Sequence, residues 1–467
     1  MVPKKKKKLN ENEKILMNKL NFSLCFFHAL IQERTKFKNK GFNNCYEFTD
    51  MELRLANENI INFVHNKNID INLLIYLIGK IIYGGIIIDI NDQKCFNIIL
   101  KKYINEIITY SNNEYKFNNY YYCPHSSNKN IFLRYIKSLQ YVTDFSIFNL
   151  HPSLNILYMK NYNFKILKNL QRLESNIMIN DQQQIHIFYI ITILKNILPN
   201  FIDTNILNYL FLNNINCSII TFLKIEADKY NYLLTIIYND LTNIIYFVQK
   251  KKIHSKNIIH TYNSLINLSI PKKWITYSFF SNLQIFHYAT LIKVKVTHIK
   301  NYIKNFKNKI FNLGAFLSPK SLLLAIRQKF SQELKVDANK IKLKYEITKY
   351  FNEDDINDKD HYYIGGFFLE GATFDITNMI IKQSTSIQLY SPMPYIKIYF
   401  LTKNISHQKY TRRNSYVFKC PIYKNIHKSG YTLTNNEPIF YLKLNSKERK
   451  EKWIERNISG VLMMKYE

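Results

Sequence analysis

The chain has 467 residues, of which 47% are hydrophobic and 15% aromatic, and this composition excludes a globally disordered protein. It contains 10 glycines and 10 prolines, too few for a collagen-like, proline-rich or glycine-rich linker class. Lysine and arginine total 65 against 34 acidic residues, giving a net charge of +31, and the length predicts roughly three domains.

The charge suggests nucleic acid or an anionic membrane as a partner. No zinc-finger spacing or RNA-recognition aromatic signature accompanies it, however. The abundant residue types Lys, Asn, Ile, Tyr and Phe share A/T-rich codons, which favours a lysine-rich exterior on an ordinary fold. No apolar run reaches the roughly 18 residues of a membrane span. The six scattered cysteines form no CxxC pair and no secretory signal opens the sequence, so we expect reduced, cytoplasmic thiols.

After a basic tip over residues 1–14, the segment 15–145 is predicted to be helical. Its Asn- and Tyr-rich part, residues 111–127, is predicted to be a loop. Apolar residues at three- and four-residue spacing predict helices over Leu16–Phe37, Leu53–Val64, Leu73–Ile82, Cys95–Ile108 and Ile131–Leu139.

The middle segment, 146–338, is also predicted to be helical. Its clearest feature is a long helix over Ile219–Val248, whose apolar residues alternate steps of four and three. Such a stripe is typical of a core face. A further helix is predicted over Leu322–Leu334.

The sequence pattern of residues 339–467 differs from that of the preceding segments, because short aromatic and β-branched runs alternate there with Gly, Pro, Asn and Asp clusters. The runs are Lys342–Ile347, Tyr362–Leu369, Tyr395–Leu401, Tyr416–Tyr423 and Phe440–Leu444. They predict a small antiparallel β module. The expected fold class is therefore α+β, with helices first and strands last.

No catalytic motif is present. A phosphate-binding loop needs two glycines at fixed spacing followed by Lys. After Gly79 and Gly84 the lysine position holds Gly85, and after Gly366 and Gly371 it is not Lys either. We therefore assign no catalytic, cofactor-binding or metal-binding residue.

Three weaker candidates have plainer interpretations. His28 follows two phenylalanines on an apolar helix face and is expected to be a core or capping histidine. Asp89 and Asp92 are three residues apart, which suits acid–base chemistry, but after two glycines a helix cap is favoured. The acidic run 353–355 lacks the glycine and glutamate of a calcium loop.

Several segments, in order, resemble dynein heavy chains. Residues 24–34, LCFFHALIQER, resemble LCFFHAxxQER in the lid of that family's sixth AAA module. Residues 366–375, GFFLEGATFD, are similar to the family's GLYLEGAxWD. Further matches are Gly41–Asn43, Tyr46–Phe48, Tyr83–Gly85 with Asp89 and Asp92, Tyr135–Leu139, Leu150–His151, Glu226 with Asn231, Ile270–Trp274, Leu313–Pro319, Arg327–Gln328, Cys420–Lys424 and Trp453–Arg456.

The resemblance implies the C-terminal region of a dynein heavy chain: an AAA lid over 15–145, then the helical part (146–338) and the β part (339–467) of the C-terminal domain. In the family, ATP and Mg²⁺ bind in earlier AAA modules and microtubules bind at a stalk. This segment is therefore expected to hold no cofactor, to be inactive alone, and to brace the ring of the same heavy chain. Other dynein subunits are expected partners, whereas a membrane or nucleic acid is not.

The motifs at 366–372 and 420–424 are closer to axonemal, especially outer-arm, chains than to cytoplasmic ones, which implies the axoneme of a cilium or flagellum. Ile86 replaces the family's arginine and puts any coupling through that charge in doubt. The alternative hypothesis is a stand-alone basic scaffold protein with a degenerate dynein tail, contacting nucleic acid or anionic surfaces.

Overall fold

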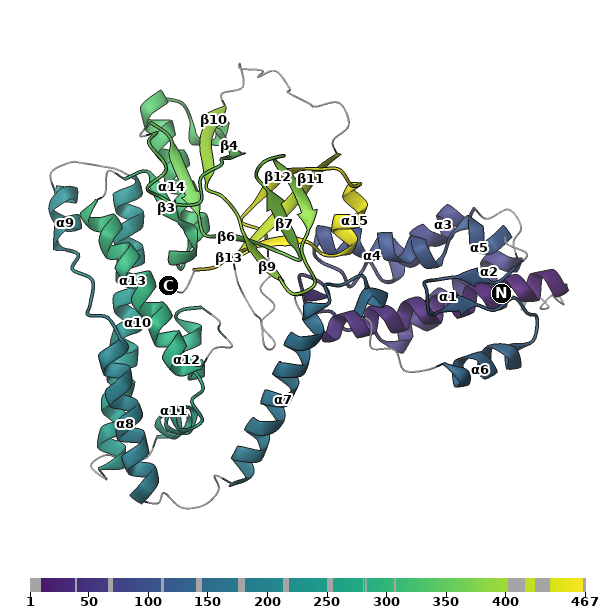
Figure 1. Cartoon of the computed structure of the whole chain (residues 1–467), viewed down its shortest axis with the longest axis horizontal. Helices are drawn as coiled ribbons and strands as arrows, with labels where there is room; N and C mark the ends of the chain where they lie inside the picture. The colour runs from purple at the N-terminus through teal and green to yellow at the C-terminus, as the bar shows by residue number, and fades with distance from the viewer. Residues whose placement is uncertain are drawn as a thin grey trace, which may run out of the picture.

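The computed structural model describes residues 10–37, 40–65, 70–110, 113–139, 145–174, 181–212, 218–249, 255–279, 281, 284–305, 308–358, 360–401, 416–424 and 437–464. The predicted basic tip lies largely outside these residues. In Figure 1 the N-terminal helices form one arm, and the long helix α7 runs from it toward a second group of helices beside two sheets.

The N-terminal helical region is built on α1, whose capping box at Asn10 and Glu13 fixes its start. Leu20, Leu24 and Phe27 of α1 enter a core of their own, separate from the large core of the rest. The elements here are α1 (Glu11–Lys36), α2 (Asp50–His65), α3 (Ile71–Tyr76), the π-helical η2 (Leu77–Ile82), α4 (Ile90–Tyr103), α5 (Glu106–Tyr110), β1 (Tyr115–Lys116), β2 (Tyr122–Cys123), α6 (Lys129–Ser138) and the 3₁₀ turn η3 (Phe145–Phe148).

The predicted loop 111–127 contains β1 and β2, two paired strands of two residues each. The predicted helix 95–108 is divided between α4 and α5. The division lies at Ile104, whose extended backbone ends α4. The side-chain oxygen of Asn105 then accepts from the Ile108 backbone N–H and so starts α5.

The second helical group surrounds α10, whose predicted stripe is buried as expected. Within the segment 146–338, which was predicted to be helical, no individual helix was predicted over 153–212 or 285–304, where α7, α8, α9 and α13 lie. The helices are α7 (Ser153–Glu174), α8 (Asp181–Ile197), α9 (Asn205–Leu212), α10 (Ser218–Val248), α11 (Lys256–Ile266), α12 (Lys272–Thr276), α13 (Ile285–Lys304) and α14 (Pro319–Leu334), with 3₁₀ turns η4 (Leu313–Ala315) and η5 (Ala338–Lys340).

Apart from the β1–β2 pair, the described strands form two sheets, ordered β3-β5-β10-β4 and β7-β8-β12-β11-β13-β6-β9. They are β3 (Ile310–Asn312), β4 (Lys342–Ile347), β5 (Tyr362–Gly365), β6 (Phe367–Glu370), β7 (Ala372–Asp375), β8 (Ile380–Gln383), β9 (Tyr390–Pro392), β10 (Ile396–Leu401), β11 (Tyr416–Lys424), β12 (Phe440–Ser446) and β13 (Ser459–Leu462), with α15 (Lys450–Glu455) between the last two.

The α+β class, with helices first and a sheet-rich part last, is confirmed, and the antiparallel module that was predicted also contains parallel pairs. Strand β13 pairs with β11, β8 with β12, and β3 with β5 in parallel. Parallel neighbours need a crossover connection, and the short helix α15 lies in the one that leads to β13. Local alternation cannot reveal such long-range pairing. The predicted run 362–369 is two strands because Gly366, at φ +84°, separates β5 from β6.

Candidate functional site: a buried seam between the helical region and the sheet

The N-terminal helical region is tied to the C-terminal sheet by side chains that we call the seam. Its members are Arg34, Lys40, Asn91 and Lys102 on the helical side and Glu370, Tyr390, Tyr423, Tyr441 and Glu455 on the other.

Arg34 lies at the centre of the seam and is completely buried. Its guanidinium donates to the main-chain carbonyls of Gly41 at 2.9 Å and Phe148 at 2.6 Å. It also donates at 3.2 Å to the carbonyl of Glu455 in α15. The ring of Phe42 lies 5.3 Å from the guanidinium carbon. The planar, multiply donating group of arginine suits this convergence of carbonyls, which an ammonium group matches poorly.

Two ion pairs flank Arg34. Lys102 of α4 pairs with the Glu455 carboxylate, and Lys40 pairs with Glu370 at the end of β6. Lys40 also donates to the Tyr390 hydroxyl at 2.7 Å. Burial lowers the pKa of Lys40, but Glu370 and Tyr390 outweigh burial and raise it above its ordinary value. Lys40 therefore remains charged at this position.

Asp89 and Asp92 have separate roles. Asp89 caps α4, accepting from the backbone of Asn91 at 2.7 Å, as predicted. Asp92 is buried and accepts from the Asn43 backbone at 2.8 Å and the Tyr46 hydroxyl at 2.8 Å. Burial raises the pKa of Asp92 to about 7. Its contacts hold the turn at 41–46 against α4, beside Arg34, rather than facing a reactive position.

A second polar centre, which we call the ionic cluster, consists of the buried residues Glu226 and Lys295 and the partly exposed Lys229 and Lys424. The Glu226 carboxylate is fully buried and accepts from the Leu317 backbone at 2.7 Å. Lys424 donates to the Leu317 carbonyl at 2.6 Å, and Lys295 donates to the Gly314 carbonyl. The cluster thus fixes the segment 313–318 between α13, α10 and β11.

A serine–histidine pair has the wrong orientation for nucleophilic catalysis. His151 Nε2 lies 3.0 Å from the Ser384 hydroxyl and 2.9 Å from the Thr385 carbonyl, so Nε2 carries the proton. The other ring nitrogen accepts from the Ser153 backbone at 3.3 Å. A general base needs a free Nε2 lone pair facing the hydroxyl. Here the histidine instead ties the start of α7 to the loop before β9.

The remaining predicted candidates do not gather into one site. His28 is buried and its Nδ1 lies 2.8 Å from the Tyr83 hydroxyl, in the core as expected. Glu353 accepts from the Tyr395 hydroxyl at 3.0 Å, in a loop far along the sequence from His28. Ile86 packs against the N-terminal core. Within the described part of the chain, no cluster of His, Cys, Asp or Glu is arranged to hold a metal ion, and no helix is long and apolar enough to cross a membrane.

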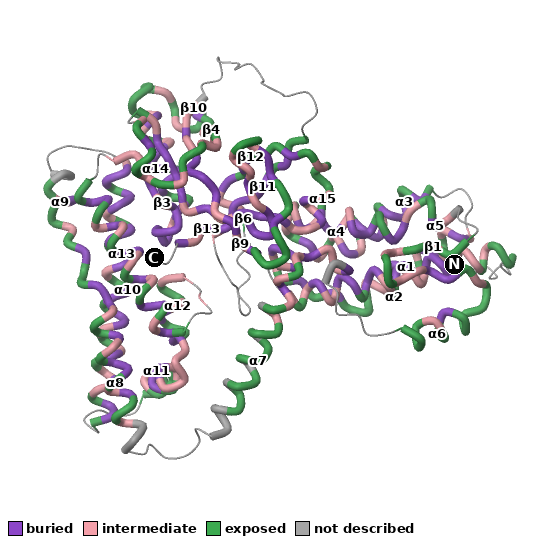
Figure 2. Tube along the Cα trace, in the orientation of Figure 1, coloured by how far each residue is buried: buried purple, intermediate pink, exposed green. Residues whose placement is uncertain are grey.

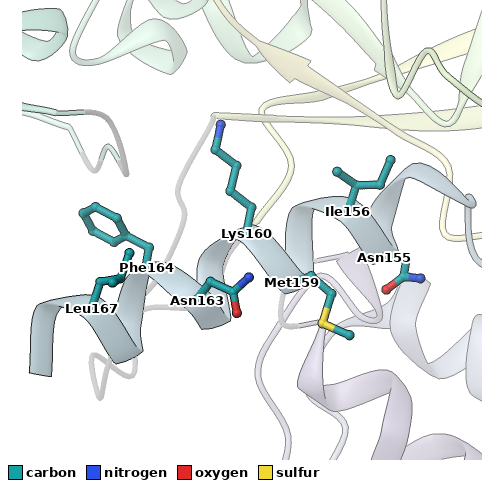
Figure 3. Close-up of a pocket in the computed structure, with 7 residues that line it drawn as sticks. All are labelled: Asn155, Ile156, Met159, Lys160, Asn163, Phe164 and Leu167. Atoms are coloured by element: carbon teal, nitrogen blue, oxygen red, sulfur yellow. The ribbon is translucent and has the colours of Figure 1, made fainter. Parts of the chain in front are cut away.

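An exposed apolar face lies on α7. Ile156 is 73% exposed and Leu167 58% exposed, and Met159 and Phe164 lie between them. Figure 2 shows α7 exposed along most of its length, and Figure 3 shows these side chains projecting from the helix around a shallow pocket. We call this surface, Ile156, Met159, Phe164 and Leu167, the α7 face.

Sequence reasoning assigned no role to the seam, although a signal was present. Arg34, Glu370 and Glu455 all lie in segments quoted above for their resemblance, as do Glu226 and Lys424 of the ionic cluster. The recurring motifs therefore mark places where distant segments are joined, rather than a reaction centre.

Comparison with known sequences agrees with the resemblance of these motifs to dynein heavy chains. The family model of the AAA lid domain of dynein heavy chains matches residues 17–154, and that of their C-terminal domain matches 160–462. Dynein axonemal heavy chain 1 of Rattus norvegicus is 26% identical over 96% of this sequence, and dynein axonemal heavy chain 3 of Homo sapiens is 25% identical over 96%. Dynein axonemal heavy chain 8 of Homo sapiens is 23% identical over 88%. The chain spans 9–11% of the length of these relatives.

Proposed function

The chain belongs to the dynein heavy chain family, as its C-terminal region, and we propose that it braces an ATP-driven microtubule motor of the axoneme. The observation that carries this proposal is the seam. Fully buried Arg34 joins the AAA lid to the last helix of the C-terminal domain, so the two parts move as one unit. Such a unit transmits or restrains movement and needs no reaction centre of its own.

The α7 face supports a docking role. Large apolar side chains exposed on one helix mark a surface that is covered in the working assembly. We propose that this face is covered by the ring of AAA modules elsewhere in the same heavy chain, and that ATP with Mg²⁺ binds in that ring. Other dynein subunits and microtubules would then be reached through the assembled motor. The stand-alone scaffold hypothesis finds no support in the comparisons, which match dynein heavy chains along nearly the whole sequence.

The first test is the size of the native polypeptide. An antibody raised against residues 443–452 is expected to detect a band far above the 56.0 kDa of this chain. A band at 56.0 kDa would overturn the proposal. The isolated chain is expected to show no ATP turnover, so nucleotide hydrolysis by the purified protein would contradict the assigned bracing role.

The second test uses two charge-matched pairs of substitutions. Ile156→Glu with Leu167→Glu alters the α7 face, whereas Asn169→Glu with Asn239→Glu places the same charge at exposed polar positions of α7 and α10 outside that face. In the isolated protein, the first pair is expected to reduce aggregation in sedimentation assays because it removes exposed apolar surface. In the full heavy chain, the same pair is expected to slow microtubule gliding several-fold. Equal effects of the two pairs would contradict docking through α7.

A further inference from the structure

The outward face of the β11–β12 hairpin is only partly covered. Along β12, Tyr441, Lys443 and Asn445 are exposed, while the residues between them are buried in the large core. On β11, Lys419 is exposed and lies directly opposite Lys443 in the antiparallel register. This face points away from the core, and its lysines are exposed among the residues that the structure describes.

One end of that face already serves as a docking surface within the molecule. Asn91, at the start of α4, donates to the hydroxyls of Tyr423 and Tyr441, both at 3.3 Å. Lys419 and Lys443 follow immediately beyond this contact, one residue pair further along the same face. The intramolecular contact therefore ends where the lysines begin.

We define the basic ladder as Lys419, Lys443 and Lys447. Among the residues that the structure describes, none of the three forms an ion pair, and all three are exposed. Like charges directly opposite each other destabilise an antiparallel pair. The hairpin bears this repulsion at Lys419 and Lys443 while nearby lysines, such as Lys452 with Glu448, are neutralised by a neighbour.

We propose that the basic ladder binds an extended acidic segment of a protein partner. Alternate residues of an extended peptide lie about 7 Å apart on one side. Glutamates at alternate positions of such a segment place one carboxylate beside the Lys419–Lys443 pair and others further along, toward Lys447, which follows the end of β12 at Ser446. Nucleic-acid binding proteins commonly neutralise about 6–10 phosphates. Three lysines on a single hairpin suit a short acidic peptide better.

The test uses the whole 467-residue protein and a fluorescent ten-residue peptide of alternating Glu and Ala, followed by anisotropy at low salt. The variant K419Q/K443Q/K447Q is expected to bind the peptide about tenfold more weakly, given the modest strength of each exposed ion pair. The control K137Q/K256Q/K272Q removes the same charge from exposed positions on α6, α11 and α12, and is expected to bind like the wild type. The melting temperature of the ladder variant is expected to equal or exceed that of the wild type, because a repulsion is removed.

Two outcomes would overturn the proposal. One is equal weakening in the ladder and control variants, which would show that net charge alone drives binding. The other is binding of oligo-dT of equal charge with the same affinity and the same loss in the ladder variant, which would assign the face to anions in general. The peptide and oligo-dT binding measurements do not depend on the size of the native polypeptide or on the α7 variants. Failure of this proposal can therefore be distinguished from failure of the proposed function.

Discussion

Arg34 and Glu455 are 421 residues apart in the sequence, and the Arg34 guanidinium donates to the Glu455 carbonyl at 3.2 Å. The same guanidinium holds Gly41 and Phe148, so one residue joins α1, the turn after it, the segment leading to α7, and α15. Removing it would leave several buried carbonyls without a donor, and such groups are costly.

Arg34→Met is therefore expected to lower the free energy of unfolding by about 2–4 kcal/mol. Urea denaturation followed by circular dichroism measures the loss. The matched control is Arg54→Met, since Arg54 is exposed on α2, and it is expected to change stability by less than about 0.5 kcal/mol. Arg34→Lys keeps the charge but loses the planar donors, so it should fall between the two. Equal stability of the two methionine variants would show that Arg34 does not hold the seam.

Local patterns were sufficient for much of the helical part. The stripe of α10 repeats along one face over 31 residues, so periodicity alone predicted its position and its buried side. Helix α7 was not predicted, because its apolar residues are distributed around the helix and do not form the single stripe that marks a buried face. The parallel pairing of β11 with β13 was beyond any local signal, since it depends on a crossover through α15.

The seam could be predicted only in part. Resemblance marked the segments that contain Arg34 and Glu455, but sequence order does not say which motifs meet. Burial of charged residues is also uncommon, so a core arginine is not a natural expectation from hydrophobic patterning. The structure shows both which motifs meet at Arg34 and that this arginine is buried.

Glu226 is expected to be the most sensitive member of the ionic cluster. Its carboxylate accepts from the backbones of Leu317 at 2.7 Å and Ser318 at 3.3 Å. Glu226→Ala leaves those amides buried without an acceptor, at a cost of about 2–4 kcal/mol in unfolding free energy. Glu226→Gln retains one acceptor oxygen and should cost less. Asp228→Asn, on the exposed side of α10, is the control, and a similar loss there would contradict the assigned role.

Lys295 is expected to make stability depend on pH. Burial lowers its pKa from 10.5 to about 7, with Lys424 adding to the effect and Glu226 opposing it. Between those values the unfolded protein binds a proton that the folded protein does not, so stability rises with pH. The penalty is complete below about pH 7 and diminishes as the pH rises through the folded pKa.

The difference between wild type and Lys295→Met isolates this contribution. From about pH 7.5 to 9.5 the wild type should gain up to about 1 kcal/mol per pH unit relative to the variant. Urea denaturation at several pH values measures the two profiles. Tyrosines whose pKa is raised by burial, such as Tyr288, affect both proteins alike and act above this window. Parallel profiles would show that Lys295 remains protonated in the folded state.

Gly366 joins β5 to β6 and is expected to tolerate no side chain. Its φ is +84°, and an added Cβ would lie 2.1 Å from the Asn312 Oδ1 atom. That oxygen accepts from the Gly314 backbone at 3.0 Å, in the segment held by Lys295, so it is not free to move away. Gly366→Ala is therefore expected to lower the free energy of unfolding by about 2–3 kcal/mol.

The matched control for Gly366→Ala is Gly85→Ala, because the nearest atom to an added Cβ at Gly85 is 3.3 Å away and its φ is not positive. It should change the unfolding free energy by less than about 1 kcal/mol. Adding Asn312→Ala to Gly366→Ala removes the closest contact of the new Cβ, but neither its 3.0 Å approach to the Gly314 backbone nitrogen nor the backbone strain. The double variant should therefore be less destabilised than the sum of the single variants. Strict additivity in thermal or urea unfolding would show that Asn312 does not limit position 366, and that the strained φ alone requires glycine.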